Sequence, residues 1–276
     1  MKVLSGKELA DYIEERQAGQ VRALRQAMRV VPKLAIVAVG ESAVSNSYIR
    51  LKQNYAEEIL IEVSVLRPTM EQVSLTIEQL NADPSVHGII VQLPLPDPSL
   101  TDNVLAMIAP EKDVDGLGPE AVYTSATATA IDWLLAGYNV ELRGKRIGIV
   151  GQGRLVGAPL AKLWATTGLD VSVFDDTTAD LAAELRSMEV IISGAGVPGL
   201  ITEHMVQPGA VVVDAGTTSE DGKIVGDVAP GLRERQDVAM TPEKGGVGPL
   251  TITALFENVI TAAVLAAEAR PGEERL

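Results

Sequence analysis

The stretch from Arg146 to Gly157 reads Arg-Ile-Gly-Ile-Val-Gly-Gln-Gly-Arg-Leu-Val-Gly, and it decides the fold. An apolar run of strand composition, Arg146–Val150, leads directly into glycines spaced G-x-G-x-x-x-G, and Ala158-Pro159-Leu160 then opens a helical pattern. Glycine permits a sharp turn and lets a pyrophosphate approach main-chain amides, which the positive end of the next helix favours. The stretch predicts a dinucleotide-binding turn, although a tight strand-to-helix turn without a ligand has the same spacing.

The next predicted strand supplies a second signal, because it ends in two acids. Asp175 and Asp176 follow the glycines by about twenty residues, where such folds place the adenosine ribose. A carboxylate there suits a free 2′-hydroxyl and opposes a 2′-phosphate, so NAD is favoured over NADP. Glycines also follow two further predicted strands, in Ser193–Gly196 and Asp214–Gly216, and they would line the same cofactor-binding crevice. The predicted cofactor-binding residues are Gly151, Gln152, Gly153, Arg154, Val156, Gly157, Asp175, Asp176, Gly194 and Gly196.

Short β-branched apolar runs alternate with stretches of helical period along the chain, which is typical of parallel α/β architecture. We predict an N-terminal α/β catalytic domain, residues 1–118 plus a C-terminal helix in 251–276 that packs back on it. A Rossmann-type parallel-sheet domain spans residues 119–250, and the joint runs through 116–129. The predicted strands are Leu34–Val39, Val63–Leu66, Gly88–Gln92, Arg146–Val150, Asp170–Phe174, Val190–Ser193, Ala210–Asp214 and Val238–Met240, and the predicted helices include Ser45–Ile59, Thr69–Asn81 and Thr251–Ala269.

The composition narrows the classes of partner. A net charge of −14 would repel nucleic acid and anionic lipid, so we expect neither nucleic acid nor membrane as a partner. The N-terminus lacks an apolar signal sequence, and we expect no stretch that could span a bilayer. The absence of cysteine fits a reducing compartment, which favours the cytoplasm. The two histidines, His87 and His204, lie far apart and form no metal-spaced cluster, so no metal site is predicted.

The candidate catalytic residues lie in the first half of the chain. Tyr48 and Lys52 are i, i+4 neighbours on one helical face, and an amine in a partly dry cleft loses its proton more readily. An exposed tyrosine–lysine pair has the same spacing. Gln92, at the end of a strand, could orient a lysine amine, and Asp115, in a turn, could accept paired N–H donors from a planar heterocycle. Strand termination and an Asx turn are the alternatives for these two residues.

These segments, in this order, resemble the bifunctional methylenetetrahydrofolate dehydrogenase/methenyltetrahydrofolate cyclohydrolase family over most of the chain. The resemblance implies that Lys52 is the general acid/base, Tyr48 lines the folate pocket, Gln92 orients the lysine and Asp115 holds the pterin ring. The motifs that carry it are YIRLK (48–52), GIIVQLPLP (88–96), EKDVDG (111–116), VGAP (156–159), GDV (226–228) and TPEKGGVGPLT (241–251). The implied substrate-binding residues are Tyr48, Lys52, Gln92, Leu93, Pro94, Asp115, Gly245, Gly246 and Pro249.

The same resemblance implies two reactions in one-carbon metabolism. 5,10-Methylenetetrahydrofolate would be oxidised with NAD or NADP, and water would open the methenyl product to 10-formyltetrahydrofolate. The resemblance also implies a homodimer. A lapsed paralogue that acts as a ligand-binding regulatory or structural subunit is one alternative, and a dehydrogenase of another small substrate is a second.

The departures from the family pattern motivate these alternatives and the cofactor prediction. Gln152-Gly153 replaces the family's Arg-Ser, and Asp175-Asp176 stands where His-Ser is frequent. The segment 125–130 keeps only the threonine of Pro-Cys-Thr-Pro-x-Gly, and Glu243-Lys244 replaces Val-Pro. These changes would alter the folate-side wall and the choice of cofactor.

Overall fold

The computed structural model describes residues 2–220 and 223–269, and it divides the chain into two compact units. We call residues 11–126 together with 252–269 the Lys52 unit, and residues 2–10 together with 127–251 the Gly151 unit. The domain bounds from the sequence, 1–118 with 251–276 and 119–250, stay a prediction. The compact units differ from them chiefly in residues 2–10, which group with the glycine turn, and in residues 119–126, which group with Lys52.

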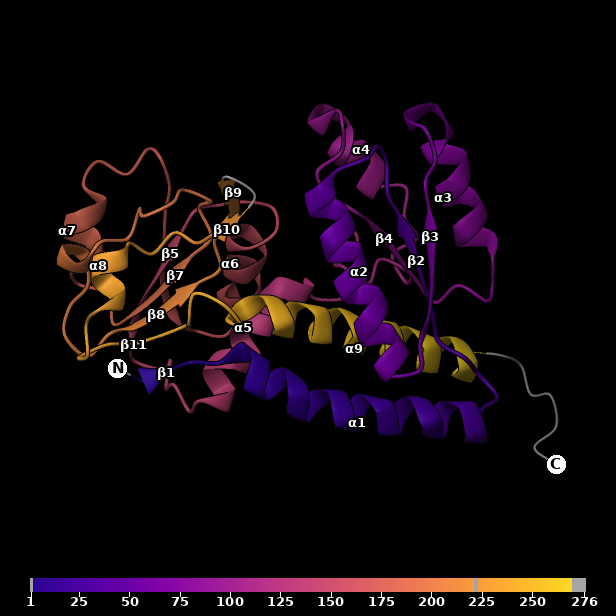
Figure 1. Ribbon diagram of the computed structural model, residues 1–276, viewed down its shortest axis with the longest axis horizontal. Helices are drawn as coiled ribbons and strands as arrows, with labels where there is room; N and C mark the ends of the chain where they lie inside the picture. The colour runs from indigo at the N-terminus through magenta and orange to yellow at the C-terminus, as the bar shows by residue number, and fades with distance from the viewer. Residues whose placement is uncertain (1, 221–222, 270–276) are drawn as a thin grey trace. The chain divides into compact units, whose positions relative to one another are not determined.

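The Gly151 unit is built on a parallel sheet with the strand order β1-β11-β8-β7-β5-β6 (Figure 1). Each neighbouring pair of strands is parallel, which confirms the predicted Rossmann-type sheet. The predicted strands of this half agree with the observed ones to within one residue at either end. The observed strands are β1 Lys2–Val3, β5 Arg146–Val150, β6 Asp170–Phe174, β7 Val190–Ser193, β8 Val211–Asp214 and β11 Ala239–Met240.

Strand β5 is the switch point of this sheet, because it lies between β6 and β7. Helix α6, Gly157–Ala165, leads from β5 to β6, and α7, Leu181–Leu185, leads from β6 to β7. After β5, the chain therefore adds β6 on one side of β5 and then β7 on the other side. Ligands of open parallel sheets bind beyond the carboxyl ends of the strands at such a switch point. Val150 pairs in register with both Phe174 and Ser193, so the three strands end level with one another.

Several elements of the Gly151 unit gave no usable pattern in the sequence. Strand β1 joins the sheet beside β11, where the Leu4 amide donates to the Met240 carbonyl at 2.9 Å. A strand of two residues is too short to show an alternating pattern. An antiparallel pair, β9 Thr218–Glu220 and β10 Lys223–Val225, was also missed. The remaining elements are α1 Gly6–Ala27, α5 Ala126–Gly137, η3 Glu203–Met205 and α8 Pro230–Arg233, of which α1 and α5 run from one unit into the other.

The Lys52 unit contains a second parallel sheet, in the order β3-β2-β4, with helices packed against it (Figure 1). The middle strand is buried at four of its five residues, as expected for a strand covered on both faces. It ends at Val37 rather than at the predicted Val39. The elements are β2 Lys33–Val37, α2 Ala43–Glu58, β3 Glu62–Leu66, η1 Met70–Gln72, α3 Val73–Ala82, β4 Gly88–Val91, η2 Pro98–Leu100 and α4 Thr101–Leu105.

The C-terminal helix α9, Val247–Glu268, begins in the Gly151 unit, and from residue 252 on it packs in the Lys52 unit against α1 and α2 (Figure 1). The Phe256 ring stacks on Tyr55 with centroids 5.4 Å apart, and the Gln17 amide donates to the Thr253 carbonyl at 3.0 Å. These contacts confirm that the last helix packs on the first domain. Its start, predicted at Thr251, lies four residues earlier, because proline is tolerated in the first turn of a helix, where amides have no intrahelical acceptor.

Helix α9 also corrects an expectation about composition. Among the described residues it is the helix long and apolar enough to cross a membrane, with a mean hydropathy of 1.8 over an 18-residue window. The expectation that no stretch has this composition is therefore wrong. Half of that window is buried inside the structure, and buried α9 residues such as Phe256 and Val259 account for this apolarity by packing.

Candidate functional site

Helix α2 positions Tyr48 and Lys52. The helix begins after Ser42, whose hydroxyl accepts from the Ser45 amide at 3.3 Å, and this contact caps the first turn. Ile49 is buried, and the helix packs against β3. Because residues four apart share one face, Tyr48 and Lys52 project from the same side, and both are half-buried.

Gln92 meets Lys52 at the carboxyl end of β4. The Lys52 Nζ donates to the Gln92 Oε1 at 2.9 Å, and the other end of the same amide donates from Nε2 to the Leu93 carbonyl at 3.0 Å. The Gln92 backbone amide is held by the Val37 carbonyl at 2.9 Å. Both ends of the side-chain amide are therefore engaged, so its oxygen is turned toward the lysine. Leu93 is half-buried, and it joins Pro94 through a cis peptide bond.

Asp115 lies in a turn that its neighbours fix. The buried Asp113 carboxylate accepts from the Gly116 amide at 3.2 Å and from the Gly118 amide at 2.6 Å. The Lys112 carbonyl accepts from the Ile89 amide at 2.7 Å, which ties the turn to β4. The Asn258 amide of α9 donates to the Val114 carbonyl at 2.9 Å and to the Thr124 carbonyl at 3.1 Å. These contacts hold the backbone of Asp115 near the end of the strand that carries Gln92.

Burial sets the protonation of this site. Loss of hydration lowers the pKa of Lys52, and the negative charge of Asp115 opposes that effect in part. Burial raises the pKa of Asp115, while the Lys52 charge acts in the opposite direction. Burial also raises the pKa of Tyr48. The lysine therefore gives up its proton at a lower pH than an exposed amine does, as a group that exchanges protons with a substrate requires.

The glycine turn after β5 packs too closely for side chains at two positions. Gly151 has a φ of +92°, and a Cβ there would lie 2.8 Å from the Ala195 backbone. A Cβ on Gly157 would lie 1.7 Å from the Gly151 carbonyl oxygen, so α6 begins directly against the turn. Gln152, Gly153 and Arg154 are exposed, whereas Val156 is buried. This geometry is that of a backbone cradle at a helix start.

Gln152 and Asp175 meet beside this turn. The Gln152 Nε2 donates to the Asp175 Oδ2 at 2.8 Å, and the Asp175 Oδ1 accepts from the Thr177 amide at 3.0 Å and from its hydroxyl at 2.6 Å. The hydrogen bonds from Thr177, and then that from Gln152, lower the pKa of Asp175. The carboxylate is therefore ionised and oriented at neutral pH. The neighbouring Asp176 is exposed.

The loop after β7 carries Gly194 and Gly196 beside the glycine turn. A Cβ on Gly194 would lie 2.5 Å from the Val156 side chain, so these two loops are in contact. The carboxylate of Asp227 accepts from the backbone amides of residues 195–197. The sequence patterns assign Asp227 no role of its own, although it lies in the GDV motif at 226–228, which is the signal that points to it.

The predicted substrate residues Gly245, Gly246 and Pro249 lie in the Gly151 unit. Gly245 has a φ of +79°, and its carbonyl accepts from the Lys7 amide at 3.0 Å. A Cβ on Gly6 would lie 1.9 Å from the Gly246 carbonyl oxygen. The backbone of this loop is therefore closely packed on residues 6–7.

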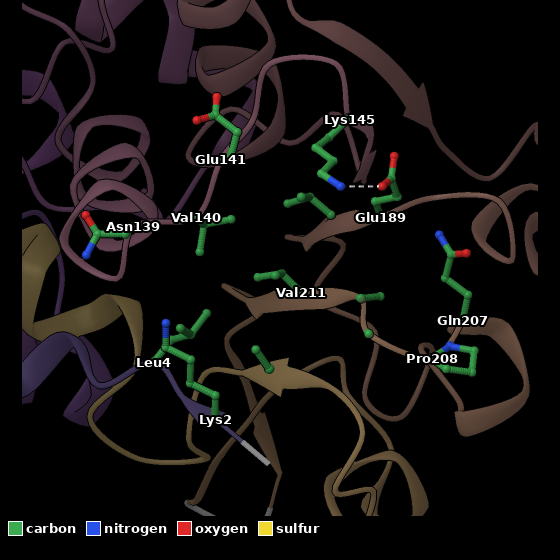
Figure 2. Close-up of a pocket in the computed structure, with 14 residues that line it drawn as sticks. Lys2, Leu4, Asn139, Val140, Glu141, Lys145, Glu189, Gln207, Pro208 and Val211 are labelled. Carbon is green, nitrogen blue, oxygen red and sulfur yellow. Dashed lines mark hydrogen bonds and ion pairs between the residues drawn. The ribbon is translucent and has the colours of Figure 1, made fainter.

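Two cavities lie in different units. One, of about 360 Å³, is lined by Gly40, Asn46, Arg67, Gln92 and Pro94 in the Lys52 unit, beside the lysine's partner. The other, of about 320 Å³, lies in the Gly151 unit at the amino ends of β7, β8 and β11 (Figure 2). The ion pair Lys145–Glu189, at 2.7 Å, lines this second cavity. It lies at the opposite strand ends from the glycine turn, so it is not the predicted cofactor site.

Comparisons with known proteins cover nearly the whole chain. The catalytic domain of tetrahydrofolate dehydrogenase/cyclohydrolase matches residues 4–115, and the NAD(P)-binding domain of the same family matches residues 125–267. The chain belongs to this family. The bifunctional protein FolD of Exiguobacterium sibiricum is 40% identical over 274 residues, covering 95% of this chain and 99% of that protein. Membership confirms the resemblance seen in the motifs.

Solved structures of the family share the fold. The bifunctional methylenetetrahydrofolate dehydrogenase/cyclohydrolase from Campylobacter jejuni is 35% identical, with a TM-score of 0.90 over 96% of this chain and 99% of that chain. The Trypanosoma brucei dehydrogenase-cyclohydrolase, complexed with NADP cofactor and inhibitor, is 30% identical, with a TM-score of 0.91 over 97% and 98%. The two-domain α/β fold class is thereby confirmed.

Proposed function

We propose that this chain oxidises 5,10-methylenetetrahydrofolate to 5,10-methenyltetrahydrofolate with a nicotinamide cofactor and hydrolyses the methenyl product to 10-formyltetrahydrofolate. The observation that carries the proposal is the Lys52–Gln92 contact, an oriented amine of lowered pKa at the end of a parallel strand. Its relatives support the proposal, since the Campylobacter jejuni protein bears the name methylenetetrahydrofolate dehydrogenase/cyclohydrolase. The chain is an enzyme of one-carbon metabolism.

Lys52 serves as the acid and base of the hydrolysis. Water adds to the methenyl carbon and loses a proton, and the bond from that carbon to N5 then breaks as N5 takes up a proton. The new hydroxyl loses its own proton to solvent as the formyl C=O forms, so one proton is released overall. The neutral Lys52 amine accepts the first proton and returns it to the leaving nitrogen. Gln92 keeps the amine aimed at the reacting carbon. A lowered pKa enlarges the fraction of neutral amine that can begin this sequence.

The other proposed substrate residues bind rather than react. The Asp115 carboxylate accepts paired N–H donors from the pterin ring, and its burial removes water that would compete for those bonds. Tyr48 lines the pocket one helical turn before Lys52. The remaining folate-binding residues are Leu93, Pro94, Gly245, Gly246 and Pro249.

The glycine turn fits a dinucleotide, because a Cβ at Gly151 would collide with the Ala195 backbone and one at Gly157 with the turn itself, so glycine alone lets this backbone close directly onto the start of α6. A nicotinamide cofactor bound there would supply the acceptor for the hydride that leaves the one-carbon bridge. We place the pyrophosphate at residues 151–157 and the adenosine ribose at Asp175. An ionised, oriented carboxylate accepts from the 2′-hydroxyl of NAD and repels the 2′-phosphate of NADP, so NAD is the preferred cofactor.

A direct assay tests the function. Purified protein is mixed with 5,10-methylenetetrahydrofolate and either NAD⁺ or NADP⁺, and the absorbance of the methenyl product and of reduced nicotinamide is followed. Methenyltetrahydrofolate alone, without nicotinamide, tests the hydrolysis separately against the uncatalysed rate in the same buffer. We expect turnover in both assays and a higher kcat/KM with NAD⁺. No turnover in either assay would refute the enzyme and leave a ligand-binding role.

The surroundings of the enzyme follow from composition and family. We propose a homodimer, as the family resemblance implies. We also propose that the protein has neither nucleic acid nor membrane as a partner, because the chain carries a net charge of −14. A cytoplasmic location is proposed because the chain has no cysteine. Light scattering during gel filtration tests the dimer, and a monomeric mass at micromolar concentration would exclude it.

A further inference from the structure

The carboxylate of Asp227 is almost completely buried beneath the loop that follows β7. Its Oδ2 accepts from the Ser193 hydroxyl at 2.7 Å, the Ala195 amide at 2.8 Å and the Gly196 amide at 3.3 Å. Its Oδ1 accepts from the Val197 amide at 2.9 Å. Three successive backbone amides are thus turned inward to one carboxylate, so these amides are not offered to a phosphate on the outer side of the loop.

Asp227 is itself held by the end of β8. Its amide donates to the Asp214 Oδ1 at 3.0 Å, and Arg233 pairs with the Asp214 Oδ2 at 2.6 Å. Two glycines make room for the carboxylates, because a Cβ on Gly216 would lie 2.2 Å from the Asp227 carboxylate and one on Gly226 would lie 2.1 Å from that of Asp214. The position of the Asp227 side chain is therefore determined from both sides.

We propose that Asp227 is a positioning residue for the nicotinamide cofactor, because it fixes the 193–197 loop against the glycine turn. The inference rests on the proposed cofactor site at Gly151, Gly194 and Gly196. Gly194 contacts Val156, and Gly151 lies so close to Ala195 that a Cβ there would meet its backbone at 2.8 Å. A displaced loop would therefore push directly on the turn that holds the pyrophosphate. Asp227 contributes no atom to the cofactor and acts through this loop.

Two substitutions disturb this contact by different means. Asp227→Asn replaces one carboxylate oxygen by an NH2 group, which is a donor facing loop amides that are also donors, so hydrogen bonds are lost. Gly216→Ala keeps the Asp227 carboxylate but displaces it, because the added Cβ would collide with it. The matched controls are Asp170→Asn, at an exposed position on β6, and Gly19→Ala, where a Cβ would meet no atom within 4 Å. Calorimetry measures the Kd of whichever cofactor, NAD⁺ or NADP⁺, the wild type binds more tightly. Hydrolysis of methenyltetrahydrofolate is the internal reference, because that reaction needs no hydride acceptor.

We expect both variants to raise the cofactor Kd about tenfold or more, as expected for loss of a buried charged hydrogen-bond acceptor, with the hydrolysis rate within about twofold of wild type. The controls change neither quantity. An unchanged Kd in both variants would overturn the proposal, and so would an equal fall in hydrolysis and cofactor affinity, since that would show a folding role alone. If the wild type has no folate activity, the proposed function fails, and the Kd compared with each variant's thermal unfolding midpoint still decides the role of Asp227.

Discussion

The Lys52 site and the Gly151 turn are built in opposite ways. Around Lys52 the functional groups are at least half-buried, and Gln92 and the backbone of Asp115 are each held by further hydrogen bonds. At the Gly151 turn the backbone is closely packed, but Gln152 and Asp176 are exposed. Burial perturbs the pKa values at the first site, whereas hydrogen bonds from neighbours orient Asp175 at the second. Under the proposed function, the chemistry would depend on a fixed interior, and the choice of cofactor would depend on a few surface groups that can be exchanged.

The largest effect expected from this contrast belongs to Lys52. Replacing it in Lys52→Ala removes the acid and base, so the hydrolysis rate should fall about a thousandfold, about 4 kcal/mol in barrier. Lys52→Arg should be nearly as inactive, because arginine keeps its proton at all accessible pH values. The measurement is kcat for methenyltetrahydrofolate hydrolysis, with the exposed Lys162→Ala as the control. Undiminished activity of Lys52→Ala would remove the lysine from the mechanism and leave the fold intact.

Asp115 should give the next largest effect, and it should change a pH profile. Its negative charge raises the pKa of Lys52 against the stronger lowering by burial. In Asp115→Asn burial acts unopposed, so the pKa of Lys52 falls further. Because the neutral amine is the base, hydrolysis rises as pH passes that pKa, and the rising limb should move to lower pH. The KM for folate should also rise about tenfold, since the amide replaces one acceptor by a donor. A limb that stays in place would mean that another group titrates.

The sequence predicted the parallel sheets well because their strands are continuous apolar runs bounded by glycine or acidic residues. It failed where the structure depends on partners distant in sequence. Strand β1 exists because Lys2 and Val3 pair with β11, more than two hundred residues away, and two residues carry no period. The start of α9 was missed because Gly248 and Pro249 are typical of a loop, yet a first helical turn tolerates both.

The site was predictable to the extent that its residues follow strands or share a helix face. Gln92 was expected to orient a lysine amine, and the structure places its oxygen 2.9 Å from Lys52. The inward direction of the amides at 195–197 could not be predicted, because Asp227 reaches that loop from thirty or more residues further along the chain. The contact of Gln152 with Asp175 was not foreseen for the same reason, although both residues had been placed near the cofactor.

A smaller effect is expected from substitution of Asp175, because this residue lies beside the Gly151 turn, the more exposed of the two sites. Asp175→Ser removes the charge that opposes a 2′-phosphate and keeps a hydroxyl for local hydrogen bonds. The ratio of kcat/KM for NAD⁺ to that for NADP⁺ should fall about tenfold, the effect of one solvated charge at short range. Asp176→Ser is the matched variant, and a larger change there would transfer the role to the second acid. A wild-type preference for NADP⁺ that survives Asp175→Ser would refute the ribose assignment.

Gln152→Ala should have the smallest effect, because it leaves the Asp175 charge in place and removes a single hydrogen bond. The carboxylate keeps its bonds from the Thr177 amide and hydroxyl, so its position should loosen rather than change. We expect the NAD⁺ to NADP⁺ ratio to fall about threefold, the effect of one exposed hydrogen bond, with hydrolysis unchanged. Gln79→Ala, an exposed glutamine on α3, is the control. If Gln152→Ala lowers the ratio as far as Asp175→Ser does, Gln152 contacts the cofactor itself, and the ribose site then comprises both side chains rather than an acid that the glutamine orients.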